Sequence, residues 1–414
     1  CAMKKHVLSK STFMRAVQCS KSLYLYQHYK KLREPFSADR QALLNRGQEI
    51  GSLAWECFPE GVDGRVGNKF MYGKAVEKTQ RLIQQGVSTI FEATFQQDQV
   101  LVMVDVLTQR NGYWEAFEVK SSARVSSNHI RDAALQYHVM EQAGIPLQDF
   151  HVMHINKSYQ RQGKLDVGEL FTSDSVIKEV RKQQPWIRKT IDYGKQVLQK
   201  PTVPKVAIGK HCTNPYPCDF ISYCWQQVPE ASVFEIGHLG AETKFDYFQQ
   251  GYTTIQDLQP ETFESPAIAI QVRSHQQQQP YLKQEALRQF LSGFRFPLAF
   301  MDFEAIMPAV PVFDQTRPFQ KIPFQYSIHY LANPAAELQH CEFIAEPGTD
   351  PHARFIEQLL ADTDGSGSLV VFEDTLERQM LEALKKRFPG YQAAIQDRLD
   401  RIVDLRYPFQ YMHY

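Results

Sequence analysis

The sequence predicts an α/β protein built from two α/β domains with a helical segment between them. Predicted helices and strands alternate over residues 1–230, a mainly helical stretch covers residues 231–296, and a new apolar strand at Leu298 begins a second alternation over residues 297–414. The chain has 414 residues, which is enough for two or three domains. Its 43% hydrophobic and 22% charged residues are typical of a globular protein.

The first domain is expected to form a mixed sheet flanked by helices. Three helices open it, and the first has a serine cap while the third ends at Gly86. Strands then dominate residues 88–122. The expected helices of this domain cover residues 9–24, 39–53, 72–85, 129–143 and 173–200, and a further strand covers residues 150–156.

A predicted hairpin in this domain sets one carboxylate opposite another. Asn111-Gly112 lies between two runs rich in β-branched and aromatic residues, which is the strongest short-range signal for a two-residue turn. Residues equidistant from this turn pair, so Asp105 faces Glu118 with side-chain roots about 5 Å apart, and Lys120 shares that face. Facing like charges destabilise a sheet, so the pair suits a hard cation such as Mg²⁺ or Mn²⁺. The alternative is a solvated, charged strand face.

Three cysteines near the end of the first domain form a second candidate site. Cys212, Cys218 and Cys224 follow a C-x5-C-x5-C spacing in a loop rich in proline and aromatic residues, and Cys19 on the first helix is the best candidate for a fourth ligand. Four thiolates suit an iron–sulfur cluster. Zinc and ordinary buried cysteines are the alternatives.

Charge and hydropathy limit the functional classes. The formal net charge is zero, so a nucleic-acid surface has to be a local patch. No stretch approaches the roughly 18 apolar residues of a membrane span, and Met3 to Ser9 lacks the apolar region of a secretory signal. We therefore expect a cytoplasmic protein without membrane contact, in which cysteines are ligands or bystanders and not disulfides.

The middle segment is expected to be helical. Its polar run from Ser274 to Pro280 predicts an exposed loop. Gly237 to Gly240 and Gly251 to Leu258 resemble a helix-hairpin-helix, which binds the DNA backbone, and a plain helical linker is the alternative.

The second α/β domain starts with a strand that carries an Asp-x-Glu pair. Strand alternation puts Asp302 and Glu304 on one face, which suits two-metal chemistry on a phosphodiester, or else a simple polar face. Further strands are expected over residues 324–331, 338–344 and 369–373, and helices over residues 352–360 and 376–388.

Taken in order, the motifs of the first domain resemble the RecB-like branch of the PD-(D/E)xK nucleases, in its iron–sulfur form. The matching residues are Cys19, Asp105, Glu118-Val119-Lys120, Gln136-Tyr137, Cys212, Cys218 and Cys224. The resemblance implies a restriction-endonuclease-like mixed sheet, a 4Fe–4S cluster on the four cysteines, and Mg²⁺ or Mn²⁺ held by Asp105 and Glu118. It also implies that Lys120 positions or activates the attacking water, and that Gln136 and Tyr137 support the site or contact DNA.

Two departures from that family stand out. Many members have C-x2-C in the last cysteine group, and many have a histidine in an early helix that is not evident in residues 46–51. Glu92, on the strand before the hairpin, is a possible substitute ligand.

Residues 297–414 resemble the DnaQ-like exonucleases, which have an RNase H-type fold. The match rests on Asp302, Glu304 and the strand–helix step at residues 369–388. It implies that Glu377 takes the place of an aspartate and that Asp404 is a further candidate. It also implies an incomplete RNase H-like domain that ends before the family's last helix.

Together these features predict a divalent-metal-dependent DNA nuclease, an exonuclease acting on DNA ends or single strands, with a structural 4Fe–4S cluster. Its partner is nucleic acid, and a helicase or a repair or defence protein is a possible second partner. Lys10 and Lys21 are among the basic residues expected to contact phosphates. The alternatives are a non-catalytic, metal-stapled module that binds nucleic acid or a protein, and a protein whose chemistry resides in the second domain.

Overall fold

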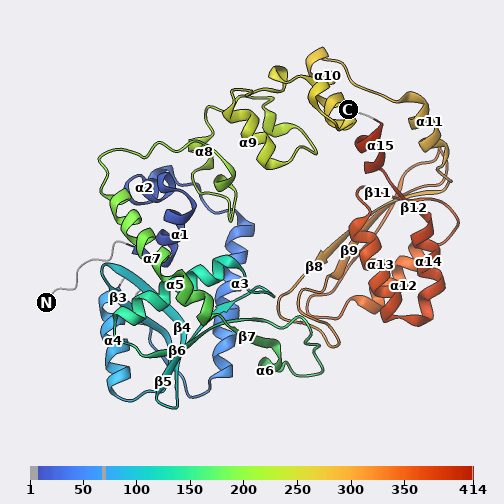
Figure 1. Cartoon of the computed structure of the whole chain (residues 1–414). Helices are drawn as coiled ribbons and strands as arrows, with labels where there is room; N and C mark the ends of the chain where they lie inside the picture. Colours follow the sequence, from blue (N-terminus) through green and yellow to red (C-terminus); the bar gives the residue numbers. More distant parts are fainter. Residues whose placement is uncertain (1–7, 68–70, 413) are drawn as a thin grey trace. The chain divides into compact units, whose positions relative to one another are not determined.

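The computed structural model describes residues 8–67, 71–412 and 414. It divides into two compact units, Cys1–Gln227 and Val228–Tyr414, and each contains a mixed β-sheet flanked by helices (Figure 1). This arrangement confirms the α/β class. The part of the expectation about a secretory signal that concerns Met3 to Val7 lies outside the described residues. None of the described helices combines the length and hydropathy of a membrane-spanning helix.

The sheet of unit 1 has the order β2-β3-β4-β5-β6-β7, and β1 pairs in parallel with β4. The β3–β4 and β4–β5 pairs are antiparallel hairpins, β5 and β6 are parallel, and β7 is an antiparallel edge. The strands are β1 (Leu8–Ser9), β2 (Val62–Asp63), β3 (Thr89–Gln97), β4 (Val100–Arg110), β5 (Tyr113–Lys120), β6 (Leu147–Ile155) and β7 (Phe171–Ser175).

The helices of unit 1 form layers on this sheet. Helix α5 packs on β3, β4 and β6, and α7 packs behind it against α1 and α2 (Figure 1). Phe13, Phe150 and Ile187 are fully buried between these layers. The helices are α1 (Lys10–Gln18), α2 (Ser20–His28), α3 (Ala38–Ala54), α4 (Tyr72–Gln84), α5 (Ser127–Gln142), α6 (Val167–Leu170), α7 (Ile177–Leu198) and α8 (Ile221–Cys224), with short 3₁₀ turns η1 (Lys30–Leu32), η2 (Trp55–Cys57) and η3 (Lys210–Cys212).

Two expected helices of unit 1 are wrong in part. The first is divided, because Cys19 is extended (φ −164°, ψ 119°) and separates α1 from α2. Cys19 is therefore in a break between helices and not on the first helix. The long helix starts at Ile177 and not at residue 173, because Phe171–Ser175 pairs with β6 as an edge strand. That pairing joins residues far apart in sequence, which local propensity does not show.

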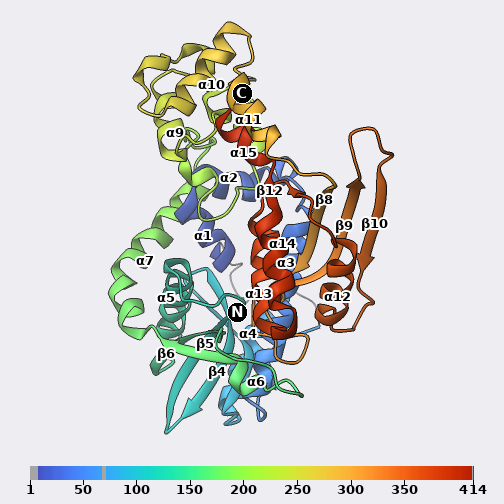
Figure 2. The same ribbon diagram turned by 90° about the vertical axis from the view of Figure 1, so that its right-hand side faces the viewer.

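The sheet of unit 2 has the order β10-β9-β8-β11-β12. Strands β8, β9 and β10 are antiparallel neighbours, whereas β8, β11 and β12 are parallel. Helices α13 and α14 run side by side next to this sheet (Figure 2). The elements are β8 (Leu298–Ile306), β9 (Ile322–Leu331), β10 (Gln339–Ile344), β11 (Leu369–Val371), β12 (Ile402–Asp404), α12 (His352–Asp362), α13 (Thr375–Arg387), α14 (Gln392–Arg401), α15 (Arg406–Tyr411) and the 3₁₀ turn η7 (Pro389–Tyr391).

Residues 228–296 belong to unit 2 and are mainly helical. They have a small core of their own that includes Val233, Ile255 and Val272. Helix α10 continues through Gln277 and ends at the left-handed Gln278 (φ 53°), so the first half of the polar run expected to be a loop is helical. The elements are α9 (Ala241–Gln249), α10 (Pro266–Gln277), α11 (Gln284–Ser292) and the 3₁₀ turns η4 (Val233–Glu235), η5 (Ile255–Asp257) and η6 (Pro260–Thr262).

Candidate functional site

The β4–β5 hairpin has the register expected from its turn. Asn111 and Gly112 both have positive φ, and the ladder runs from Arg110–Tyr113 to Val106–Phe117. The next residues along the two strands are Asp105 and Glu118. The ladder ends before them, and Asp105 Oδ2 accepts a hydrogen bond from the Val119 backbone N–H at 2.6 Å. The predicted register is therefore confirmed as far as Val106–Phe117, and the two carboxylates lie one residue further on, where the strands separate.

A third carboxylate flanks Asp105 from the other side. The pairs Phe91–Val106 and Ala93–Val104 place Glu92 of β3 opposite Asp105 of β4. Glu92 has a left-handed backbone (φ 51°), which is strained for a residue with a side chain and interrupts the β3–β4 ladder. The structure thus places Glu92, Asp105 and Glu118 on three adjacent strands, and Glu92, expected as a substitute ligand, lies on the strand next to Asp105.

Glu118 lies at the centre of a network of cationic and amide donors. Its side chain is 1% exposed, and its Oε1 accepts from Lys10 Nζ at 2.6 Å and from Lys120 Nζ at 2.7 Å. Its Oε2 accepts from Gln136 Nε2 at 2.6 Å. Lys120 is also held by Asp132 Oδ2 at 2.8 Å. Two charge-assisted hydrogen bonds from lysines and one hydrogen bond from the Gln136 side-chain amide offset the cost of burying this carboxylate.

The two facing carboxylates have opposite electrostatic environments. Burial and the neighbouring Glu118 raise the pKa of Asp105 to about 7. Burial also disfavours ionisation of Glu118, but Lys10 and Lys120 outweigh it and hold its pKa below the usual range. Burial raises the pKa of Glu92 as well, although Lys10 and Arg65 oppose that shift. The site therefore has one firmly ionised carboxylate beside two that resist ionisation.

The two helix residues expected at this site have different positions. Gln136 is fully buried, and its Oε1 has no hydrogen-bond partner among the described residues. Tyr137 instead packs into the core, and its hydroxyl donates to Glu141 Oε1 at 3.2 Å. The structure therefore brings Gln136, but not Tyr137, to the carboxylates. Within the described ranges, no three His, Cys, Asp or Glu side chains are grouped so as to hold a single metal ion.

Sequence reasoning missed the roles of two residues here. Lys10 was expected at a phosphate, yet it is bonded to Glu118, and Asp132 was not considered although it anchors Lys120. Asp132 is near Gln136 on α5, on the helix turn before it, so helical spacing could have indicated it. Nothing local to residue 10 indicates its role, because it depends on the pairing of β1 with β4.

The four predicted cysteines line one pocket. Cys19, Cys212, Cys218 and Cys224 surround it together with Lys21 and apolar side chains of residues 206–208, 220 and 221. Burial raises the pKa of the Cys19 thiol, the backbone amides of Ser22 and Lys21 counter this shift, and Cys218 and Cys212 add to it. The six cysteines in the described part of the chain are free thiols.

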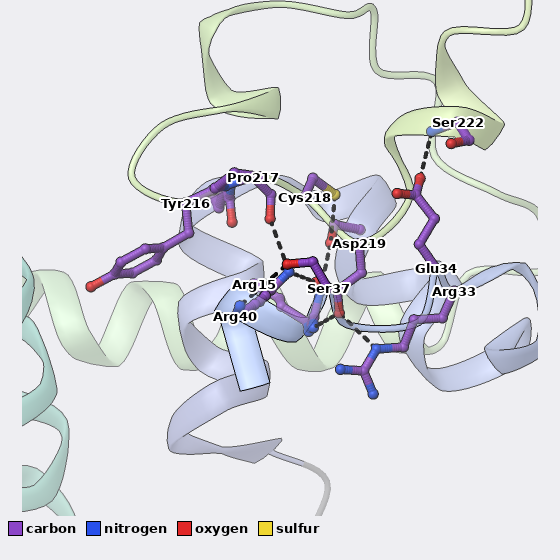
Figure 3. A network of polar contacts seen from close by, with 12 residues as sticks. Arg15, Arg33, Glu34, Ser37, Arg40, Tyr216, Pro217, Cys218, Asp219 and Ser222 are labelled. Carbon is purple, nitrogen blue, oxygen red and sulfur yellow. Dashed lines mark hydrogen bonds and ion pairs between the residues drawn. The ribbon is translucent and has the colours of Figure 1, made fainter. Parts of the chain in front are cut away.

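A buried carboxylate fastens the cysteine loop to the N-terminal helices (Figure 3). Asp219 follows Cys218 and is 1% exposed in its side chain. It pairs with Arg15 at 2.5 Å, Arg33 at 2.7 Å and Arg40 at 2.8 Å. Burial disfavours its ionisation, but Arg15 and the other guanidinium groups lower its pKa. One side chain therefore links the loop to α1, α3 and the segment between α2 and α3.

Arg15 extends this link to the pocket itself. It donates to Ser22 Oγ at 3.2 Å, and the Cys218 thiol donates to the same oxygen at 3.4 Å. The rings of Tyr26 and Phe36 lie under the three guanidinium groups and support their orientation.

The carboxylates predicted in unit 2 are arranged differently. Asp302 and Glu304 are exposed on one face of β8, as alternation requires. Glu377 of α13 is buried, accepts from the Phe303 backbone N–H at 3.4 Å, and has no partner for Oε2 among the described residues. Burial raises its pKa, and Asp302 contributes to that shift. Asp404 accepts from the backbone N–H groups of Glu373 and Arg406, so it ties the ends of β11 and β12.

Comparison with known proteins adds one match. The model of a family described only as a domain of unknown function (DUF2779) matches residues 299–414, which include the whole β8–β12 sheet except the first residue of β8. No curated protein matches the chain.

Proposed function

We propose that unit 1 is a divalent-metal-dependent nuclease that hydrolyses DNA. The observation that carries this proposal is the convergence of Glu92, Asp105 and Glu118 on three adjacent strands, with Lys120 beside them. Buried like charges are costly, and sites that tolerate them often serve catalysis. By the family resemblance, the substrate is a DNA end or a single strand, and a helicase or a repair or defence protein is a possible partner.

The residue types fit a hard cation. Asp105 and Glu118 are the principal ligands proposed and Glu92 is the third, because carboxylates provide the all-oxygen donor set that Mg²⁺ and Mn²⁺ prefer. In the described part of the chain the three side chains are not grouped so as to hold one ion, so binding would require them to rearrange. The chemistry that the ion supplies when bound is Lewis-acid activation of water and of the phosphodiester. Gln136 Oε1 has no hydrogen-bond partner among the described residues, so it is available to accept a hydrogen bond from the attacking water and orient it once the site opens to solvent.

Lys120 serves the reaction as a fixed positive charge. Glu118 and Asp132 hold its ammonium group on two sides, so its position does not depend on substrate. Burial disfavours its charged form, but Glu118 and Asp132 outweigh that effect and raise its pKa. A lysine that stays protonated stabilises negative charge on the attacking oxygen and the phosphate, and it does not act as a base.

For the cysteine pocket we propose a four-thiolate structural group, the 4Fe–4S cluster implied by the resemblance, with zinc as the alternative. Four sulfurs line one largely apolar pocket, and Asp219, next to Cys218, ties this loop to Arg15 of α1. A group at this position would join the α1–α2 break to the loop around α8. Iron and sulfide analysis of anaerobically purified protein tests the choice, because one zinc and no iron per chain would contradict the cluster.

The nuclease proposal is tested with Asp105→Ala and Glu118→Gln on single- and double-stranded DNA with Mn²⁺. Each change is expected to lower the cleavage rate by about a thousandfold, the scale on which transition-state charge stabilisation acts. Asp302→Ala in the same full-length protein is the control and is expected to retain activity. Cleavage that persists in both unit 1 variants would exclude this site. DNA binding without turnover at any divalent metal would favour a non-catalytic binding module.

A second candidate function is hydrolysis by unit 2. The observation in its favour is that buried Glu377 has no hydrogen-bond partner for Oε2 in the described part of the chain, and that the negative charge of Asp302 contributes to its raised pKa. Loss of cleavage in Asp302→Ala, together with normal cleavage in Asp105→Ala, would assign the chemistry to this unit.

A further inference from the structure

Lys10 is placed at the carboxylate centre by the backbone. Strand β1 pairs in parallel with β4 at Leu8–Val100 and Ser9–Leu101. The β3 edge of these two β4 residues is already occupied, so β1 lies on the β5 side of β4, where β5 has ended its ladder. Ser9 then caps α1 through a reciprocal bond with Thr12, in which Ser9 N–H donates to Thr12 Oγ1 at 2.7 Å. Lys10, as the first residue of α1, therefore starts on the β5 side of β4, and its side chain reaches Glu118.

Of the two lysines on Glu118 Oε1, Lys10 is the one that can leave. Lys120 has a second anchor in Asp132, and its side chain is 19% exposed. Lys10 is 34% exposed, and its only side-chain hydrogen bond within the described ranges is to Glu118. Its long aliphatic stem can move the ammonium group into solvent while the helix start stays in place.

We propose that Lys10 is a displaceable internal cation that occupies the metal position and competes with Mg²⁺ or Mn²⁺ for Glu118. This inference rests on the proposed function, since it describes how the same site is controlled. Lys10 Nζ is 2.6 Å from Glu118 Oε1, so a metal ion that bound through this oxygen would have to displace the ammonium group. Once displaced, the ammonium group remains tethered at the start of α1, and a substrate phosphate replaces Glu118 as its counter-ion.

The test measures Mn²⁺ affinity of the full chain by electron paramagnetic resonance. Lys10→Met keeps the side-chain length without its charge and is expected to bind Mn²⁺ about tenfold more tightly, because a charge-assisted hydrogen bond no longer has to be broken. Lys10→Arg keeps the charge and is expected to stay within about threefold of the unmodified protein.

Lys195→Met is the matched control for a general charge effect. Lys195 also forms a lysine–aspartate pair, with Asp98 at 2.6 Å. Asp98 lies in the β3–β4 turn, about 20 Å from Asp105 along β4. This change is expected to leave Mn²⁺ affinity unaltered, and a tenfold gain here would overturn the specific role of Lys10.

A second measurement needs no substitution at Lys10. Acylation of lysines in the unmodified protein, read by mass spectrometry, is expected to rise severalfold at Lys10 when Mn²⁺ is added and to stay unchanged at Lys120. Unchanged acylation at Lys10 with Mn²⁺ bound would overturn the inference.

Glu118→Gln separates this inference from the proposed function. If Glu118→Gln abolishes Mn²⁺ binding while Lys10→Met binds as the unmodified protein does, Lys10 is not a competitor and the metal site stands. If Glu118→Gln binds Mn²⁺ normally, the metal site itself is wrong and the inference falls with it.

Discussion

The carboxylate clusters of the two units meet the cost of burial in different ways. In unit 1, buried Glu118 stays ionised because Lys10, Lys120 and Gln136 surround it. In unit 2, buried Glu377 accepts a weak hydrogen bond from the Phe303 backbone N–H, and burial raises its pKa. A buried acid can therefore be kept ionised by internal cations, or it can retain its proton more readily. Removing its charge is expected to lower stability in the first case and not in the second.

Glu118→Ala is expected to have the largest effect on stability. It leaves Lys10 and Lys120 without their shared counter-charge, which should lower the free energy of opening β4 and β5 by about 3 kcal/mol. Hydrogen exchange of peptides from these strands in the full chain measures this. The control is Glu115→Ala on the same strand, whose partner Arg110 is 61% exposed at 3.6 Å, with an expected loss of about 0.5 kcal/mol. Equal losses for the two variants would contradict the conclusion that Lys10 and Lys120 keep buried Glu118 ionised.

Asp219→Asn tests a second buried carboxylate of unit 1, which is paired with three arginines, whereas Glu118 is paired with two lysines. The amide cannot balance the charges of Arg15, Arg33 and Arg40. The free energy of opening of residues 210–224, measured by hydrogen exchange, is therefore expected to fall by about 2 kcal/mol. Bound metal should also be lost on dialysis. Asp98→Asn is the control, because Asp98 is 78% exposed. Full metal retention in Asp219→Asn would show that the loop does not need this link.

The pH dependence of the metal-free protein tests Asp105. Its pKa in the folded state is raised from 3.8 to about 7, so folding favours the protonated form. The stability from this group is therefore complete below about pH 4 and is lost as the pH rises through about 7. Asp105→Asn has no such proton to lose. The free energy of opening of β4, measured by hydrogen exchange, should therefore depend less on pH in this variant. An identical pH profile in the two proteins would contradict the raised pKa.

Glu377→Gln is expected to have the smallest effect and the opposite sign to Glu118→Ala. The amide oxygen still accepts from the Phe303 N–H, and the variant has no charge to bury. We expect the free energy of opening of β8, measured by hydrogen exchange above pH 7, to be unchanged or to rise by up to about 1 kcal/mol. A loss of more than about 1 kcal/mol would reveal a cation at Glu377 and remove the contrast between the two units.

The sequence was sufficient to predict contacts set by local geometry. The Asn111-Gly112 turn determines the register that brings Asp105 and Glu118 together, and alternation along β8 places Asp302 and Glu304 on one face. The same strand logic made Glu92 a candidate, since it lies on the strand that precedes the hairpin.

Local sequence patterns could not predict contacts between segments that are far apart in the chain. The role of Lys10 depends on a two-residue strand that pairs about 90 residues further along the chain. The break at Cys19 has no glycine or proline to mark it, and the three arginines around Asp219 come from segments whose packing no periodicity specifies. Tyr137 does not join Gln136 at the carboxylates, because neighbours on a helix point in directions about 100° apart and cannot both reach one site.

The link through Asp219 has a consequence for biosynthesis. The arginines that it joins are made about 180 to 200 residues before it, and so is Cys19. All strands of the unit 1 sheet are therefore synthesised before its last three cysteines, and an inorganic group held by the four cysteines would be inserted only after the whole sheet sequence has been made. Chains released early would keep an ordered sheet but expose a cationic surface with no acid to cover it.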